Sequence, residues 1–198
     1  MTGNKSFSTS ADAKLLAKNA AGQTPETLWI GCADSRVPET TVCNCQPGDI
    51  FVHRNIANSI QSDDLNSAAV IEYAVNFLKV KRVVVCGHTK CGGAAASLGD
   101  ADLGETLNNW LKPMRALRKK HQADLDALSS DDAKTTRMAE LNAMMSLDAI
   151  KANSTVANAM KERGLEVYGV IYDIPKGEIV ELKEVEGKKG LFTMNGQA

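Results

Sequence analysis

Short apolar runs alternate with segments of helical periodicity along most of the chain. The runs that predict strands cover residues 28–30, 50–53, 82–86 and 166–173. Near-continuous apolar strands separated mostly by helices are typical of a parallel sheet covered on both faces. Residues 178–182 alternate polar and apolar positions after a turn containing Pro175, which predicts an antiparallel edge strand. The pattern therefore predicts an α/β fold, with a mostly parallel four-stranded sheet, helices on both faces and an antiparallel fifth edge strand.

Apolar residues three and four positions apart predict the intervening helices. These are a short helix at 11–20 after loose residues 1–10, a short helix opened by Pro38, a helix with Tyr73 and Phe77 on its apolar face, a helix at 103–121 and a long run at 131–163 ended by Gly164. Gly87 is expected to stop the strand that begins at residue 82.

The length of 198 residues is that of one ordinary domain. We expect a short N-terminal helical arm at 1–22 and a single α/β domain at 23–198. Lys and Arg total 23 against 24 for Asp and Glu, so the charge of -1 gives no reason to expect nucleic acid or an anionic membrane as partner. The expected partner is a small molecule.

The five cysteines are an odd number without the spacing of a secreted disulfide framework. This usage indicates a reducing compartment, with thiols free for metal binding or burial. The chain shows neither a signal-like apolar core at its start nor 18 consecutive apolar residues. We therefore expect a cytoplasmic protein that does not span a membrane.

Three residues at the ends of predicted strands form a candidate metal site. His88 and Cys91 follow the strand at 82–86, and Cys32 follows the strand at 28–30. Sites in parallel sheets form beyond the carboxyl ends of the strands, so these side chains are expected to converge. A Cys, His and Cys set leaves a tetrahedral zinc with one open position, which is typical of a catalytic site, and zinc lowers the pKa of water to about 7. The competing interpretation is that each cysteine is a small core residue, as we expect for Cys86.

Asp34 and Arg36 follow Cys32 at alternate positions. On an extended turn the carboxylate of Asp34 could accept a hydrogen bond from water at the metal, while Arg36 holds that carboxylate. An ordinary Asp-x-Arg pair is more often a local ion pair at a helix start, and its place beside a metal ligand favours the functional interpretation.

The residues 32–36, Cys-Ala-Asp-Ser-Arg, and 87–93, Gly-His-Thr-Lys-Cys-Gly-Gly, resemble the paired motifs of the β-class carbonic anhydrases. The resemblance extends from about residue 23 to 182. It implies one zinc ion per subunit held by Cys32, His88 and Cys91, a catalytic dyad of Asp34 and Arg36, and reversible hydration of carbon dioxide to bicarbonate and a proton. It also implies a homodimeric unit, with a tetramer as a further option.

The resemblance implies further site residues. Gln23 stands where the family places a glutamine that binds substrate from the partner subunit. The apolar positions of the same pocket are Phe51, Ile56 and Tyr73, each of which core packing would also explain. Gly92 is placed so that its backbone N–H can hold an anion at a helix start.

Trp29, Arg54 and Tyr172 match a second, non-catalytic bicarbonate site that a subset of the family uses. In that subset Asp34 can turn onto the zinc and displace water, with loss of its pairing to Arg36. We predict that this chain can adopt that closed state, although burial of Trp29 and a structural ion pair of Arg54 would explain these residues equally.

Two alternative functions are open at this level. The same ligand set could hydrolyse carbonyl sulfide or carbon disulfide. The chain could also be a non-catalytic zinc or bicarbonate-binding protein, and a structural zinc site would take Cys43 or Cys45 as its fourth ligand. We expect these two cysteines to be inert, with a redox-sensitive pair as the other possibility.

Overall fold

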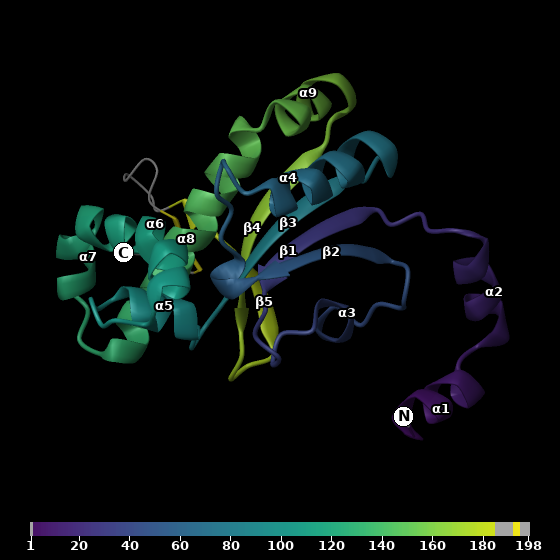
Figure 1. Ribbon diagram of the computed structural model, residues 1–198, viewed down its shortest axis with the longest axis horizontal. Coiled ribbons are helices and arrows are strands. Elements are labelled where there is room, and N and C mark those ends of the chain that lie inside the picture. Colours follow the sequence, from purple (N-terminus) through teal and green to yellow (C-terminus); the bar gives the residue numbers. More distant parts are fainter. Residues whose placement is uncertain (1, 185–191, 195–198) are drawn as a thin grey trace.

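A five-stranded sheet forms the centre of the computed structural model, which describes residues 2–184 and 192–194 (Figure 1). The strands lie in the order β2-β1-β3-β4-β5 and are β1 (Thr27–Cys32), β2 (Ile50–Asn55), β3 (Arg82–His88), β4 (Glu166–Asp173) and β5 (Glu178–Glu181). The first four are parallel, and β5 pairs antiparallel with β4. A separate two-stranded sheet pairs β6 (Lys183–Glu184) antiparallel with β7 (Phe192–Thr193). The predicted fold class is confirmed.

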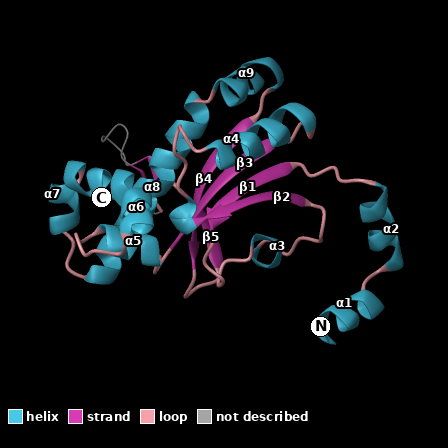
Figure 2. Cartoon of the chain, in the orientation of Figure 1, coloured by secondary structure: helices cyan, strands magenta, loops and turns pink. Residues whose placement is uncertain are grey.

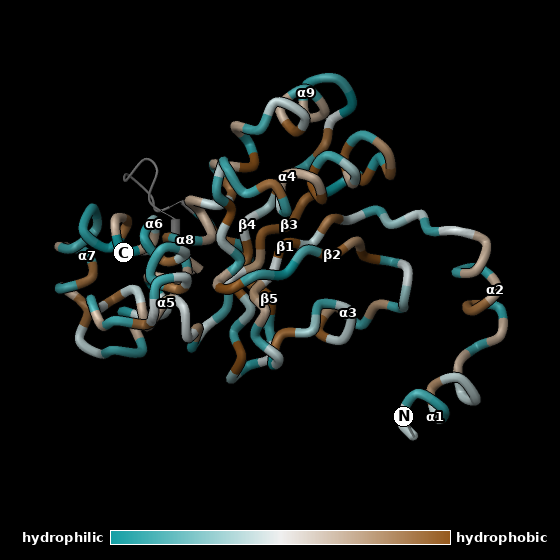
Figure 3. Tube along the Cα trace, viewed as in Figure 1, coloured by the Kyte–Doolittle hydropathy of each residue, from teal (hydrophilic) through white to brown (hydrophobic). Residues whose placement is uncertain are grey.

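Helices cover the two faces of the sheet unequally. The helices α4 (Leu65–Glu72), α8 (Asp131–Ala152) and α9 (Ser154–Arg163) pack on one face, over the main apolar core. The other face carries Trp29, Cys86 and Val170, with the short helix α3 (Glu39–Val42) beside it. Figures 1 and 2 show α4 and α9 on one side of the strands and α3 on the other, and Figure 3 shows the apolar character of the strands between them.

A second apolar cluster lies beyond the carboxyl ends of β1 and β3. It joins Cys32 and Cys91 to buried residues of α6 (Glu105–Lys120), α7 (Gln122–Asp126) and α8. The short helix α5 (Gly92–Ser97) contributes Ala94 to the same cluster. This cluster shields the strand ends from water on the side where the candidate site lies.

The long helix predicted for residues 131–163 is divided in two. The side chain of Asn153 accepts hydrogen bonds from the backbone N–H groups of Thr155 and Val156, so it caps a new helix. Local capping therefore overrides a periodicity that continues through the break. The predicted end is confirmed, because Gly164 has φ 69° in the left-handed region.

The helix after Asp64 does not bury all the side chains of its predicted apolar face. After α4 the backbone forms a π-helical turn, η2 (Tyr73–Phe77), whose wider spacing rotates the following side chains around the axis. Ala74 and Val75 are fully buried, whereas Tyr73 is 47% and Phe77 70% exposed. The prediction that Tyr73 and Phe77 face the core was therefore wrong.

The N-terminal segment is helical in two pieces that lie apart from the sheet (Figure 1). The prediction of loose residues at 1–10 was wrong, since α1 spans Thr2–Ser10 and its hydroxyl groups donate to carbonyls three or four residues earlier. The helix α2 (Ala13–Ala21) follows a cap at Asp12. Neither helix has a buried residue, and Asn19 Nδ2 donates to the carbonyl of Pro47 at 2.8 Å.

Gly87 continues β3 instead of ending it. The strand runs through His88, and a Cβ at residue 87 would lie 2.8 Å from Ile171 Cδ1 and 3.4 Å from the Ala139 carbonyl. The glycine is needed because α8 packs closely on the strand at this point. Among the described residues, no helix has the length and apolarity needed to cross a membrane.

Candidate metal centre

Cys32, His88 and Cys91 converge at one point, as their positions at strand ends predict. Cys32 ends β1, His88 ends the neighbouring strand β3, and Cys91 directly precedes α5. Their potential ligand atoms all lie within 4.8 Å of one another. The three residues are 6%, 0% and 2% exposed.

The hydrogen bonds of His88 leave one ring nitrogen directed to this group. Nδ1 lies 2.9 Å from the carbonyl oxygen of Thr89, and since a carbonyl can only accept, Nδ1 carries the proton. Nε2 then has a free lone pair, and it is buried without a hydrogen-bond partner among the described residues. A buried imidazole lone pair beside two thiols is a donor set that fits zinc.

The two thiols differ in acidity because they interact with each other. The neighbouring Cys91 thiol, and next the His88 ring, lower the pKa of Cys32, and this outweighs the opposing effect of burial. The same pairing, together with burial, raises the pKa of Cys91. Metal ligation requires deprotonated thiols, so a cation bound here would replace the proton that the pair retains.

Cys86 behaves as the predicted core residue. It is 1% exposed, and burial raises the pKa of its thiol far above the usual range. A neutral buried thiol is a poor nucleophile and ligand.

Asp34 and Arg36 form the predicted pair. Arg36 Nε donates to Asp34 Oδ1 at 2.9 Å and Nη2 donates to Oδ2 at 2.7 Å, which is a bidentate arrangement. The hydrogen bonds from Arg36 hold the pKa of the Asp34 carboxyl well below its usual value. Asp34 Oδ2 lies 3.9 Å from His88 Nε2. This ionised carboxylate is therefore at the edge of the metal-ligand group.

Two contacts that the sequence analysis missed position this pair. Arg36 Nη2 also donates to the Lys90 carbonyl at 3.1 Å, and Lys90 has φ 57° between His88 and Cys91. Arg54 donates to the carbonyls of Cys32 and Asp34. Both contacts use backbone acceptors, for which side-chain identity in the sequence gives no indication.

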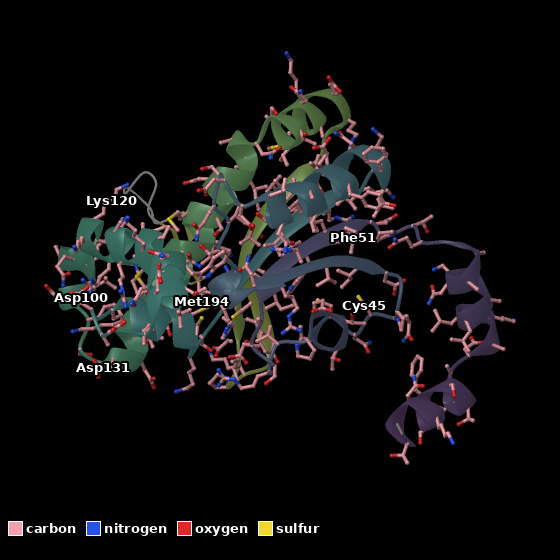
Figure 4. The ribbon with its side chains drawn as sticks, in the orientation of Figure 1. Cys45, Phe51, Asp100, Lys120, Asp131 and Met194 are labelled. Carbon is pink, nitrogen blue, oxygen red and sulfur yellow. The ribbon has the colours of Figure 1, made fainter. Side chains whose placement is uncertain are left out.

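Two of the three apolar residues expected in the pocket, Tyr73 and Ile56, have exposed side chains, and Phe51 is partly buried against the main core. The rings of Phe51 and Tyr73 have centroids 5.7 Å apart, and Phe77 stacks on Tyr73 at 5.6 Å. Ile56 is 44% exposed. Phe51, labelled in Figure 4, belongs to β2, which is an edge strand of the sheet. Such an apolar surface favours an interaction with another protein.

Gln23 and Gly92 are also accessible. Gln23 is exposed in the segment between α2 and β1. Among the described residues other than its chain neighbours and its own helix backbone, no atom lies within 4 Å of the position that a Cβ on Gly92 would take, so there is open space beside Cys91.

Trp29, Arg54 and Tyr172 lie on the face of the sheet that also carries Cys86. Trp29 is 3% exposed, and its Nε1 has no hydrogen-bond partner in the described part of the chain. The guanidinium of Arg54 already contacts two carbonyls and lies 3.6 Å from Glu39 Oε2.

Cys43 and Cys45 lie away from the ligand group. Cys45 lies beside α3 (Figure 4), and its Sγ lies 3.5 Å from the carbonyl of Cys43. Within residues 2–184 and 192–194, the group of potential metal ligands contains Cys32, His88 and Cys91 and neither of these two cysteines. All five cysteines are free thiols.

Replacing Gly93 by alanine should lower the free energy of unfolding by about 1–3 kcal/mol through overpacking. The added Cβ would lie 2.9 Å from Ala57 Cβ and 3.4 Å from Ile56 Cγ2. Gly92→Ala is the matched control, because its Cβ would meet no atom of another described segment within 4 Å and alanine favours the helix. Urea unfolding of both variants measures the difference, and equal stabilities would contradict the close packing at Gly93.

The fold and the site together define an α/β protein with a buried Cys, His and Cys metal-ligand group at the carboxyl ends of parallel strands. The family model described as carbonic anhydrase matches residues 27–179. The chain therefore belongs to the carbonic anhydrase family, and solved relatives identify the β class within it.

Three relatives illustrate the similarity. A structure of the β-carbonic anhydrase CafA of Aspergillus fumigatus has 51% identity and a TM-score of 0.89, covering 92% of this chain and 88% of that one. One of two tetrameric β-carbonic anhydrases of Sordaria macrospora has 46% identity and a TM-score of 0.86, with 97% and 92% coverage. The carbonic anhydrase of Candida albicans is 42% identical over a match that covers 83% of this chain. The chain spans 59% of that relative's length.

Proposed function

We propose that this protein is a zinc-dependent carbonic anhydrase, a carbonate dehydratase of the lyase class, which catalyses the reversible hydration of carbon dioxide to bicarbonate and a proton. The observation that carries the proposal is the position of the Asp34 carboxylate, 3.9 Å from the metal-directed nitrogen of His88 and held by Arg36. A purely structural zinc site has four protein ligands and needs no ionised carboxylate beside it.

Cys32, His88 and Cys91 would hold one zinc ion per subunit. When bound, zinc lowers the pKa of water so that hydroxide is available near neutral pH. Asp34 would accept a hydrogen bond from the nucleophilic oxygen and orient its lone pair toward carbon dioxide. Arg36 keeps that carboxylate ionised and fixed in direction, so that Asp34 stays available as a hydrogen-bond acceptor.

The substrate pocket is proposed to form between two subunits. Phe51, Ile56 and Tyr73 would supply apolar walls suited to carbon dioxide, and the Gly92 N–H would hold the anionic product. Gln23 would reach the pocket from the partner subunit. The exposed aromatic surface beside edge strand β2 supports a homodimer. A tetramer is the larger option, as in the Sordaria macrospora relatives.

The domain arrangement and location follow the same proposal. The proposed arrangement is a helical arm at 1–22 and a single catalytic domain at 23–198. The five free thiols support a reducing location such as the cytoplasm.

The alternatives are hydrolysis of carbonyl sulfide or carbon disulfide, and a non-catalytic zinc or bicarbonate-binding role. The identities of 42–51% to carbonic anhydrases favour neither. Stopped-flow hydration of carbon dioxide across a pH series, with zinc content measured on the same sample, tests the proposal. Hydration above the buffer background that scales with zinc supports it. Turnover of carbonyl sulfide or carbon disulfide without hydration of carbon dioxide would show that the protein is a hydrolase instead. Zinc binding without turnover of any of these substrates would show a non-catalytic role.

We also propose a second bicarbonate site at Trp29, Arg54 and Tyr172. The buried Nε1 of Trp29 supports it, because this donor lacks an acceptor among the described residues and costs desolvation energy until one binds. A bound anion here would favour the closed state in which Asp34 takes the fourth zinc position. Trp29→Phe should then weaken the inhibition of hydration by added bicarbonate, most clearly at the low-pH end of the series. Identical bicarbonate inhibition in the variant and the wild type would argue against this site.

A further inference from the structure

The backbone segment from Cys32 to Asp34 connects the metal ligand to the dyad carboxylate. β1 ends at Cys32, and its last register pairs are Gly31 with Cys86 of β3 and Cys32 with Asn55 of β2. Beyond this point one more backbone hydrogen bond, from the Ala33 N–H to the Asn55 carbonyl at 2.7 Å, holds the chain to β2, and the ladder then ends. The distance between the Cys32 thiol and the Asp34 carboxylate therefore depends on what holds this short segment.

One guanidinium holds both ends of the segment. Arg54 Nε donates to the Cys32 carbonyl at 2.8 Å, and Nη2 donates to the Asp34 carbonyl at 2.5 Å. Arg54 lies opposite Gly31 in the β1–β2 register, one residue before Asn55, which pairs with Cys32. A planar guanidinium presents its donors in a fixed geometry, so it sets the spacing of the two carbonyls.

The counter-charge of Arg54 lies elsewhere. Glu39 Oε2 is 3.6 Å from Arg54 Nη1, and the two side chains are 14% and 28% exposed. The Asp34 carboxylate is occupied by Arg36 instead. Arg54 thus acts on the site through backbone carbonyls and not as the ionic partner of Asp34.

We infer that Arg54 is a positioning residue for the reaction, which fixes the Cys32–Asp34 segment and thereby the carboxylate relative to the metal. The inference rests on the proposed function for its kinetic consequence. A loosened segment would let the Asp34 carboxylate and the Cys32 thiolate shift in position while the metal stays bound. A misplacement of about 1 Å at a reacting group costs on the order of a hundredfold in rate.

Arg54→Lys tests this inference, because lysine keeps the charge but cannot bridge two carbonyls with a planar fork. The expected result is a fall in kcat of about 10- to 100-fold with an unchanged zinc content, and with KM within about twofold of the wild type. Arg54→Gln, measured in parallel, removes the charge and retains one donor group, and it should show the same loss.

Arg163→Lys is the matched control. Arg163 also donates to two backbone carbonyls, those of Val80 at 2.7 Å and Val75 at 3.0 Å, in a part of the fold away from the metal ligands. It should lower thermal stability but leave kcat per folded molecule unchanged.

A cobalt(II) spectrum of the metal-exchanged proteins separates this inference from the proposed function. We expect the visible absorption bands of Arg54→Lys to shift, because they report ligand geometry, and those of Arg163→Lys to match the wild type. The shift is expected even if the wild type fails to hydrate carbon dioxide. A wild-type cobalt spectrum in either folded Arg54 variant would overturn the inference, as would a kcat loss of equal size in Arg163→Lys.

Discussion

Replacement of Cys32 by alanine should abolish stoichiometric zinc binding and lower kcat/KM for carbon dioxide hydration by more than about a thousandfold. The variant retains one imidazole and one thiol, whereas zinc sites need at least three protein ligands. Without the metal, the pKa of water stays near 15.7 instead of about 7, so hydroxide is scarce at neutral pH. Metal analysis of the purified protein and stopped-flow hydration measure the two effects.

The double variant Cys43→Ser with Cys45→Ser is the control for this experiment. These thiols lie outside the ligand group of the described residues, so zinc content and activity should stay at wild-type values. Thermal unfolding adds a second readout, since a bound metal stabilises the native state and Cys32→Ala should unfold at a lower temperature. Full zinc content in Cys32→Ala, or zinc loss in the serine double variant, would refute the three-ligand assignment.

Replacement of Asp34 by asparagine should lower kcat by about 100-fold while zinc remains bound. The amide keeps the shape of the side chain but has one acceptor oxygen in place of two, and its NH2 group would oppose either Arg36 or the metal side. The bidentate pair with Arg36 is lost, and with it the fixed acceptor beside the ligands. Outer-shell partners of metal ligands typically contribute on the order of 10- to 100-fold to metal affinity or activity.

Asp132→Asn provides the matched change at an exposed carboxylate. Asp132 pairs with Lys90 at 2.9 Å, and its side chain is 77% exposed, so its loss should change stability by less than about 1 kcal/mol. Its kcat should stay within about twofold of the wild type. Undiminished activity in Asp34→Asn, at equal zinc content, would remove the dyad from the mechanism.

The convergence of the candidate metal ligands could be predicted because their positions follow from strand ends. A parallel sheet brings the carboxyl ends of its strands to one edge, so Cys32 and His88 must approach each other although 56 positions separate them. The pairing of Asp34 with Arg36 is similarly local, because alternate residues of an extended segment point the same way. The resemblance to the β-class carbonic anhydrases supplied the pocket and bicarbonate-site assignments, which remain proposals.

The helix boundaries show where local patterns compete. Apolar periodicity continues through Asn153, yet its side chain caps a new helix there. The π-helical turn at Tyr73–Phe77 shifts the apolar face by a fraction of a turn, which exposes Phe77. Both features depend on how the backbone meets its neighbours in the fold, and a residue pattern cannot rank such alternatives.

The sequence by itself determined the fold class, the convergence of Cys32, His88 and Cys91, and the pairing of Asp34 with Arg36, because each depends on strand order or on near neighbours along the chain. Only the tertiary structure decided how the dyad is held. The contacts of Arg54 with the carbonyls of Cys32 and Asp34, and of Arg36 with the carbonyl of Lys90, join separate segments through backbone atoms. Every residue carries the same carbonyl group, so such contacts arise from the packed geometry and leave no trace in the identity of the accepting residue.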